Sequence, residues 1–236
     1  MDSANKRVLV LQHAGPEHLG RIAKALTQQR VEYTYVRPDL GEMIPSSMDG
    51  FAGLILMGGP QSVYEEDKFP FLRADKSLTR HAVSTNRPVL GVCLGSQILA
   101  EVLGSRVHPG AMFELGWKKV MISAEVAEDP VLGHLPREIV PLHWHGDVYY
   151  LPGGAKPAGS SELTPVQGFV CSQRLYGLLF HLEPELEQVA AMAATFPNDV
   201  RRGGVKPTAL LAEAPKRVEA LRENGVEVFR KWALLL

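Results

Sequence analysis

Apolar residues along the first hundred positions follow two patterns that alternate. Short runs rich in β-branched and aliphatic residues predict strands at residues 8–11, 31–36, 51–57 and 88–93. Segments whose apolar positions keep helical spacing predict helices at residues 16–29, 69–84 and 96–103. Strands that alternate with helices in this way indicate right-handed crossovers and a mostly parallel sheet with helices on both faces.

The pattern changes after Gly104. Short β-like runs separated by Pro, Gly and Asp favour hairpins at residues 118–122, 139–144, 166–171 and 175–180. Helical spacing returns at residues 184–194 and from Pro207 to Trp232, with an interruption expected at Asn224 and Gly225. The predicted fold class is α/β, with three layers: a mostly parallel central sheet, helices on both of its faces, and an added antiparallel β layer. No repeat or charged linker divides the sequence, so residues 1–236 are expected to form one domain.

Composition and charge narrow the classes of function. The 236 residues are 45% hydrophobic and 22% charged with a formal net charge of -1, as in an ordinary globular protein. This charge gives no electrostatic reason to expect a nucleic acid or membrane partner, so small molecules are the expected substrates. Residues 1–12 lack an apolar core long enough for a signal peptide. Because Cys93 and Cys171 are the only cysteines, no disulfide framework is available, and a cytoplasmic location is expected.

Residues 91–95 have the sequence Gly-Val-Cys-Leu-Gly between a predicted buried strand and a predicted helix. This form is typical of a nucleophile elbow, in which flanking glycines allow a sharp turn that exposes the central side chain. The start of the following helix directs N–H groups at the sulfur, which is expected to lower the pKa of the thiol. Cys93 is therefore the predicted nucleophile. Cys171 lies in a β-like run without such a turn and is interpreted as core or sheet surface.

A base for this thiol is predicted at the end of a later strand. His181 directly follows the apolar residues 178–180, and Glu183 comes two residues later. On extended backbone the two side chains point the same way, so the carboxylate can orient the imidazole. Gly58-Gly59-Pro60 ends another strand, and the N–H groups of Gly59 and Leu94 could together stabilise an oxyanion.

Four motifs in this order carry a family resemblance: Gly58-Gly59-Pro60, residues 91–97, His145-Gly146-Asp147 and residues 180–183. The sequence resembles the class I glutamine amidotransferases, with the greatest similarity to free-standing relatives of the glutaminase domain of GMP synthase. The resemblance spans nearly the whole chain and implies their flavodoxin-like fold. It also implies hydrolysis of the glutamine side-chain amide through a γ-glutamyl thioester, with release of glutamate and ammonia and without a cofactor.

The resemblance assigns residues to roles. It implies that Cys93 is the nucleophile, His181 the acid and base, and Glu183 the residue that orients it. It also implies that Gly59 and Leu94 are the oxyanion donors. Contacts to the amide, carboxylate or amino end of the substrate are implied for Gly58, Gln97, Gly146 and Asp147.

The sequence departs from the family pattern at two positions. Ser96 stands where many members carry a larger residue, and Leu182 replaces a proline that is common between the catalytic His and Glu. Both change the shape of the pocket, so a γ-glutamyl peptide or conjugate hydrolase with the same triad is the alternative. No P-loop is present, and any synthetase that uses the ammonia is expected to be a separate subunit.

Two other classes of function compete with this interpretation. His143, His145 and Asp147 have H-x-H-x-D spacing, which could place three metal ligands on one face of an extended segment, as in a metallo-hydrolase. That hypothesis leaves the elbow unexplained, so no metal site is predicted. A non-catalytic binding subunit would not require an intact Cys93, and the enzyme is therefore favoured.

Overall fold

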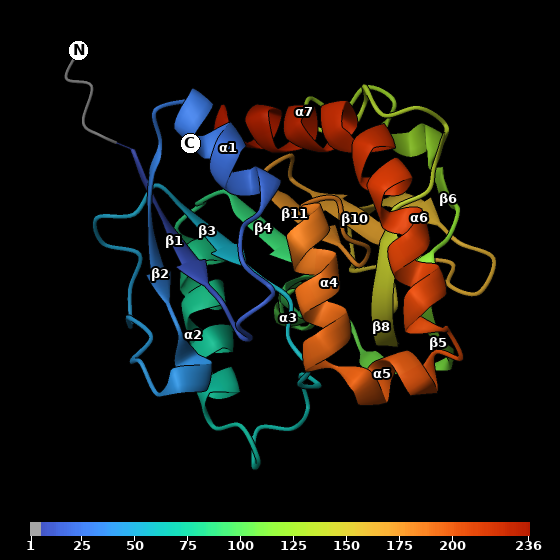
Figure 1. Cartoon of the computed structure of the whole chain (residues 1–236). Coiled ribbons are helices and arrows are strands. Elements are labelled where there is room, and N and C mark those ends of the chain that lie inside the picture. The colour runs from blue at the N-terminus through green and yellow to red at the C-terminus, as the bar shows by residue number, and fades with distance from the viewer. Residues whose placement is uncertain (1–5) are drawn as a thin grey trace.

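The computed structural model describes residues 6–236 and is built on a nine-stranded sheet (Figure 1). The strand order is β2-β1-β3-β4-β11-β10-β9-β6-β7. Neighbours from β2 to β11 are parallel, and neighbours from β11 to β7 are antiparallel. The strands are β1 (Arg7–Leu11), β2 (Glu32–Val36), β3 (Gly53–Leu56), β4 (Val89–Val92), β6 (Val120–Ile122), β7 (Glu138–Ile139), β9 (Lys156–Ser160), β10 (Gly168–Cys171) and β11 (Leu175–Leu178).

Helices cover both faces of this sheet. Because side chains alternate along a strand, Val8 and Val10 of β1 pack in the cluster that includes α1 and α7. Leu9 and Leu11 pack in the cluster that includes α2 and α3. No helix within residues 6–236 is both long and apolar enough to cross a bilayer. The helices are α1 (Arg21–Gln28), α2 (Phe71–Ser84), α3 (Leu94–Val102), α4 (Leu186–Thr195), α5 (Pro197–Arg202), α6 (Pro207–Ala220) and α7 (Arg222–Ala233), with short 3-10 turns η1 (Pro38–Leu40) and η2 (Ala124–Val126).

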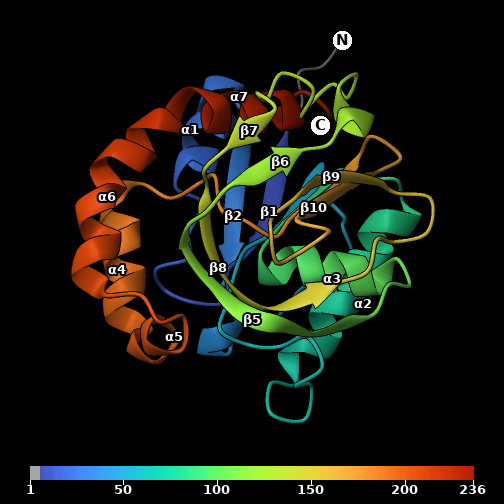
Figure 2. The ribbon, with the colours of Figure 1, turned by 90° about the vertical axis from the view of Figure 1, so that its right-hand side faces the viewer.

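A second, two-stranded antiparallel sheet is formed by β5 (Val107–Trp117) and β8 (Leu142–Tyr149). Figure 2 shows it as a long curved band in front of the central sheet, with α4, α5 and α6 at one side. Leu115 and Trp144 from this sheet share a third apolar cluster with residues of α4, α5 and α6. This band is the predicted added antiparallel layer, and the predicted α/β fold class is confirmed.

Several boundaries differ from the prediction. The helix expected at residues 16–29 begins only at Arg21, because Gly20 has a positive φ of 49°. The run at residues 139–144 is divided between β7 and β8, with Pro141 in the gap. The interruption expected at Asn224 and Gly225 is wrong, since both residues lie inside α7. The break comes earlier, at Leu221 between α6 and α7.

Candidate active site

Cys93 occupies a strained turn between β4 and α3. Its φ of 49° and ψ of -111° lie outside the regions that residues with a side chain normally adopt. A Cβ at Gly91 would lie 2.4 Å from Gly95 O, and one at Gly95 would lie 2.0 Å from Leu56 O. Both glycines are therefore required for the turn to pack against β3, and the geometry is that of a nucleophile elbow.

The Cys93 thiol is only 5% exposed, and this burial changes its acidity. Burial raises the pKa of Cys93, although a hydrogen bond with the His181 side chain and another from Leu94 N–H act in the lowering direction. The expectation of a lowered thiol pKa is therefore wrong. The N–H at the helix start contributes as expected, but the cost of an anion in a buried site outweighs it.

His181 and Glu183 form a buried pair beside this thiol. Glu183 Oε1 lies 2.7 Å from His181 Nδ1, and the two residues are 1% and 2% exposed. Burial by itself lowers the pKa of His181, but the Glu183 carboxylate and the hydrogen bond with Cys93 together raise it well above its ordinary value. The backbone N–H of His181 donates to Leu142 O, which fixes the segment after β11 against β8. The structure thus brings together Cys93, His181 and Glu183.

Glu17 is a further acidic group at this site that the sequence did not predict. It is 5% exposed, and its carboxylate lies against Gly58, where an added Cβ would be 1.7 Å from Glu17 Oε2 and 3.5 Å from Cys93 Cβ. Burial raises the pKa of Glu17 to about 7, with the positive charge of His181 opposing that shift. The expected helix at residues 16–29 concealed this residue, because Glu17 lies in the loop that precedes α1.

The loop after β3 meets the elbow. A Cβ at Gly59 would lie 2.9 Å from Leu94 Cδ2 and 2.7 Å from His13 Cβ, so only glycine fits there. Gly59 and Cys93 line the same pocket. The two backbone segments expected to supply the oxyanion donors are therefore neighbours across Gly59 and Leu94.

The far wall of the pocket is formed by β8 and α3. Gln97 and Asp147 both line it, and Gln97 Nε2 donates to Asp147 O at 3.1 Å. The Asp147 carboxylate accepts a hydrogen bond from Tyr64 Oη at 3.0 Å. Gly146 also lines the pocket, and a Cβ there would lie 2.8 Å from the Phe113 ring. The predicted substrate contacts Gly58, Gln97, Gly146 and Asp147 are thus gathered around Cys93.

Helix α5 adds two charged residues to the pocket that sequence reasoning missed. Asp199 and Arg202 line it from this helix, and Asp199 Oδ2 accepts a hydrogen bond from Trp144 Nε1 at 3.1 Å. The Arg202 guanidinium lies 4.9 Å from the centre of the Phe113 ring. Their spacing of three residues places both on one helix face, but no sequence signal indicates that this face packs on the pocket.

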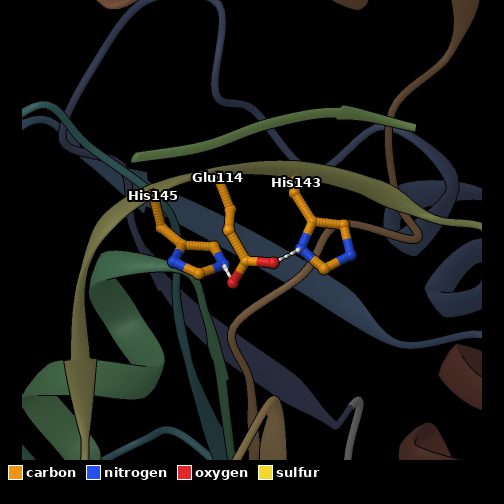
Figure 3. A group of neighbouring side chains, drawn as sticks. All are labelled: Glu114, His143 and His145. Carbon is orange, nitrogen blue, oxygen red and sulfur yellow. Dashed lines mark ion pairs between the residues drawn. The ribbon is translucent and has the colours of Figure 1, made fainter. Parts of the chain in front are cut away.

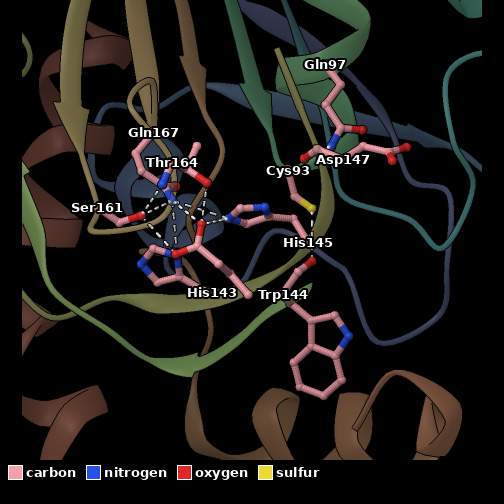
Figure 4. Close-up of polar contacts among 10 residues, drawn as sticks. Cys93, Gln97, His143, Trp144, His145, Asp147, Ser161, Thr164 and Gln167 are labelled. Carbon is pink, nitrogen blue, oxygen red and sulfur yellow. Dashed lines mark hydrogen bonds and ion pairs between the residues drawn. The ribbon is translucent and has the colours of Figure 1, made fainter. Parts of the chain in front are cut away.

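The hypothetical metal set His143, His145 and Asp147 does not assemble. Figure 4 shows Asp147 beside Gln97, with the two histidine rings directed to another group of polar side chains. The pairing of β5 with β8 is irregular between Pro109 and Glu114, and this irregularity breaks the simple alternation of side chains between His145 and Asp147. Glu114 joins the two histidines instead, and the ligand atoms of these three residues lie within 4.8 Å of one another.

Comparison with known proteins agrees with this geometry. The profile of the family "Glutamine amidotransferase class-I" matches residues 15–196. A glutamine amidotransferase-like protein of Salmonella typhimurium, YfeJ, is 30% identical over 189 residues, which are 79% of each protein. A GMP synthase (glutamine-hydrolyzing) of Acinetobacter baylyi is 36% identical over 155 residues, 64% of this chain but only 26% of that protein.

A solved structure extends the similarity to the whole chain. The glutamine amidotransferase TM1158 of Thermotoga maritima superposes with a TM-score of 0.88 at 28% identity, covering 97% of this chain and 98% of that one. The chain belongs to the class I glutamine amidotransferases, a family of enzymes. Within that family it resembles the GMP synthase glutaminase part, as the sequence motifs predicted.

Proposed function

We propose that this protein hydrolyses the side-chain amide of glutamine through a γ-glutamyl thioester on Cys93. One observation carries the proposal: the buried Cys93 thiol is hydrogen-bonded to His181, whose other ring nitrogen lies 2.7 Å from Glu183 Oε1. A thiol, an imidazole and a carboxylate in this order form the relay that nucleophilic catalysis requires.

The proposed reaction begins with proton transfer. His181 accepts the thiol proton, and the sulfur attacks the amide carbon to give a tetrahedral oxyanion. The N–H groups of Gly59 and Leu94 would donate to that oxygen, since the two residues adjoin at the pocket. His181 then gives the proton to the leaving nitrogen, ammonia departs, and water activated by His181 cleaves the thioester to glutamate.

Substrate recognition is proposed for the opposite wall of the pocket. The Asp147 carboxylate would pair with the substrate ammonium, and Gln97 and Gly146 would contact its polar groups, because all three line the pocket with Cys93. Gly58 leaves room for the substrate between Glu17 and the thiol, where a side chain would collide with the carboxylate.

The test is a glutamate-release assay on glutamine and on γ-glutamyl dipeptides. Wild-type protein is expected to release glutamate from glutamine, and Cys93→Ala is expected to lower the rate at least about 10³-fold, because no thioester can form. Cys171→Ala is the matched control and should keep the rate, since Cys171 is a half-buried thiol of β10 away from the pocket lining. Release from the dipeptides alone would replace the amide substrate by a γ-glutamyl conjugate. No release from either class would refute the proposal.

We further propose that residues 1–236 form a single glutamine amidotransferase-like domain that supplies ammonia to a separate synthetase subunit. The first five of these residues lie outside the described part of the chain. The A. baylyi GMP synthase supports the second point, because this chain matches only 26% of that protein. The measurement is whether the purified chain enables an ammonia-dependent synthetase to use glutamine, and a failure with every candidate synthetase would contradict it.

A cytoplasmic location is proposed on chemical grounds. Cys93 and Cys171 are both free thiols in the structure, as is usual in a reducing compartment. Cell fractionation tests this, and recovery of the protein in an oxidising compartment would contradict it.

A further inference from the structure

Three buried polar residues meet behind the pocket wall, on the face of the β5–β8 sheet opposite the Trp144 side chain (Figures 3 and 4). Glu114 of β5 is the cross-strand partner of His145 of β8, and His143 lies two residues earlier on the same face of β8. Glu114, His143 and His145 are 1%, 0% and 3% exposed. A His-x-His strand segment with a third ligand on the adjacent strand presents three donor atoms to a single point.

The spacing of these atoms suits one bound ion better than direct hydrogen bonds. His145 Nε2 lies 3.5 Å and His143 Nδ1 lies 3.8 Å from the nearer oxygen of Glu114. With metal–ligand bonds of about 2.0–2.2 Å, tetrahedral coordination places ligand atoms roughly 3.3–3.6 Å apart. Movements of a few tenths of an ångström would therefore bring the three residues onto a metal.

The hydrogen bonds around the cluster are incomplete. Ser161, Thr164 and Gln167 donate to Glu114, and all three are neutral side chains. Gln167 Nε2 also lies 3.4 Å from His143 Nδ1 and from His145 Nε2, although an amide nitrogen has only two hydrogens to donate. Within the described residues, Gln167 Oε1 is buried and has no hydrogen-bond partner. Crowded acceptors around a buried carboxylate favour a cation at their centre.

We propose that Glu114, His143 and His145 bind a divalent transition-metal ion of the Zn²⁺ type. Two imidazole nitrogens and a carboxylate form a common zinc ligand set, and a half-turn of the Gln167 amide would direct its unpaired oxygen to the fourth position. A surface depression lined by Glu114, Ser161 and Lys118 provides an access route to the carboxylate.

The site holds the wall of the catalytic pocket in place. Trp144 lies between the two histidine ligands, and its carbonyl oxygen lies 3.4 Å from Cys93 Sγ, where the thiol donates to it. Gly146, the residue after His145, lines the pocket itself. Metal at this site therefore fixes the backbone that faces the sulfur, without taking part in the chemistry.

Cobalt titration of the full chain tests the proposal. Protein freed of metal with a chelator is titrated with Co²⁺ and, in parallel, with Zn²⁺ by calorimetry. We expect one ion per chain, and visible Co²⁺ bands with the intensity of a tetrahedral site. Cys93→Ala should bind as the wild type does, because the thiol is not a ligand. Glu114→Gln, which nearly keeps the size of the side chain, and His145→Ala should weaken binding by about 100-fold or more.

His108→Asn is the matched control, since His108 belongs to the same sheet but lies outside the cluster and is expected to bind metal normally. Circular dichroism of each variant shows whether it folds, and the Cys93→Ala titration decides the matter should the cluster variants not fold. Absence of stoichiometric binding in Cys93→Ala would overturn the proposal. Unchanged binding in a folded Glu114→Gln protein would overturn it as well. None of these readouts depends on glutaminase activity, so the proposed function can fail without affecting the result.

Discussion

Glu17 and Cys93 face each other across Gly58, and their charges oppose each other. Ionised Glu17 raises the pKa of the Cys93 thiol, because two anions in one buried site repel. Burial raises the pKa of Glu17 itself to about 7. The protonation state of this one carboxyl therefore changes within the pH range where the enzyme would work, and it affects how easily the thiolate forms.

Glu17→Gln removes this titration at nearly constant side-chain volume. We expect the Cys93 pKa to fall, and the inflection near pH 7 in the rate of Cys93 alkylation by iodoacetamide to disappear. The rate is measured against pH in a Cys171→Ser background, so that only one thiol reacts. An alkylation profile that is the same with glutamate and glutamine at position 17 would contradict the assigned coupling.

The same substitution changes stability with a definite sign. The pKa of Glu17 in the folded protein, about 7, lies above the ordinary value of 4.5, so the folded state binds the proton more tightly. The free energy of unfolding should then decrease as pH rises from about 4.5 to about 7, by roughly 3 kcal/mol from this group alone. Urea unfolding of Glu17→Gln across this range should show a correspondingly smaller decrease.

At the scale of elements, the contact of α3 with β3 sets the direction of the elbow. Gly95 in the first turn of α3 lies directly on the backbone of Leu56, the last residue of β3. Helix and strand approach here more closely than any side chain would allow. This approach places the start of α3, and hence Leu94 N–H, beneath the Cys93 sulfur.

Gly95→Ala places a methyl group 2.0 Å from Leu56 O and forces α3 away from β3. We expect the free energy of unfolding to fall by roughly 3 kcal/mol and glutamate release to fall with it, because the elbow must shift. Gly153→Ala, where an added Cβ meets nothing within 4 Å, is the control and should change stability by less than about 0.5 kcal/mol. Equal stability of the two variants in urea titrations would disprove the close contact.

At the scale of the whole molecule, the C-terminal helices tie distant segments to the site. Arg21 is 1% exposed, and its guanidinium donates to Leu182 O at 3.2 Å and to Val218 O. One side chain of α1 thereby joins α6 to the segment that carries His181 and Glu183. Trp232 of α7 is fully buried in the same core cluster as α1 and β1.

Trp232→Ala tests how far the fold depends on this closure. We expect a loss of about 3–5 kcal/mol in the free energy of unfolding, because a large buried side chain leaves a cavity against the sheet. Leu234→Ala, at a position that is 56% exposed, is the control and should cost much less. A loss below 1 kcal/mol for Trp232→Ala in equilibrium unfolding would show that α7 contributes little to the core.

The parts of the site that the sequence predicted are those formed by neighbours in the chain. The elbow at residues 91–95 is one turn of backbone, so its glycine spacing identifies Cys93 directly. His181 and Glu183 are two residues apart on extended backbone, and their pairing at 2.7 Å follows from that spacing. Glu17 was missed because the positive φ of Gly20 delays the helix, which the apolar spacing does not reveal.

The sequence by itself determined the α/β class, the elbow and the His-Glu pair, because each depends on periodicity or spacing within a few residues. Only the tertiary structure decided which distant groups join them. Burial in the assembled fold raised the thiol pKa that the helix start alone would lower. The irregular pairing of β5 with β8 put Glu114 beside the histidines and left Asp147 in the pocket. Burial and strand register arise from long-range packing, so no local pattern contains them.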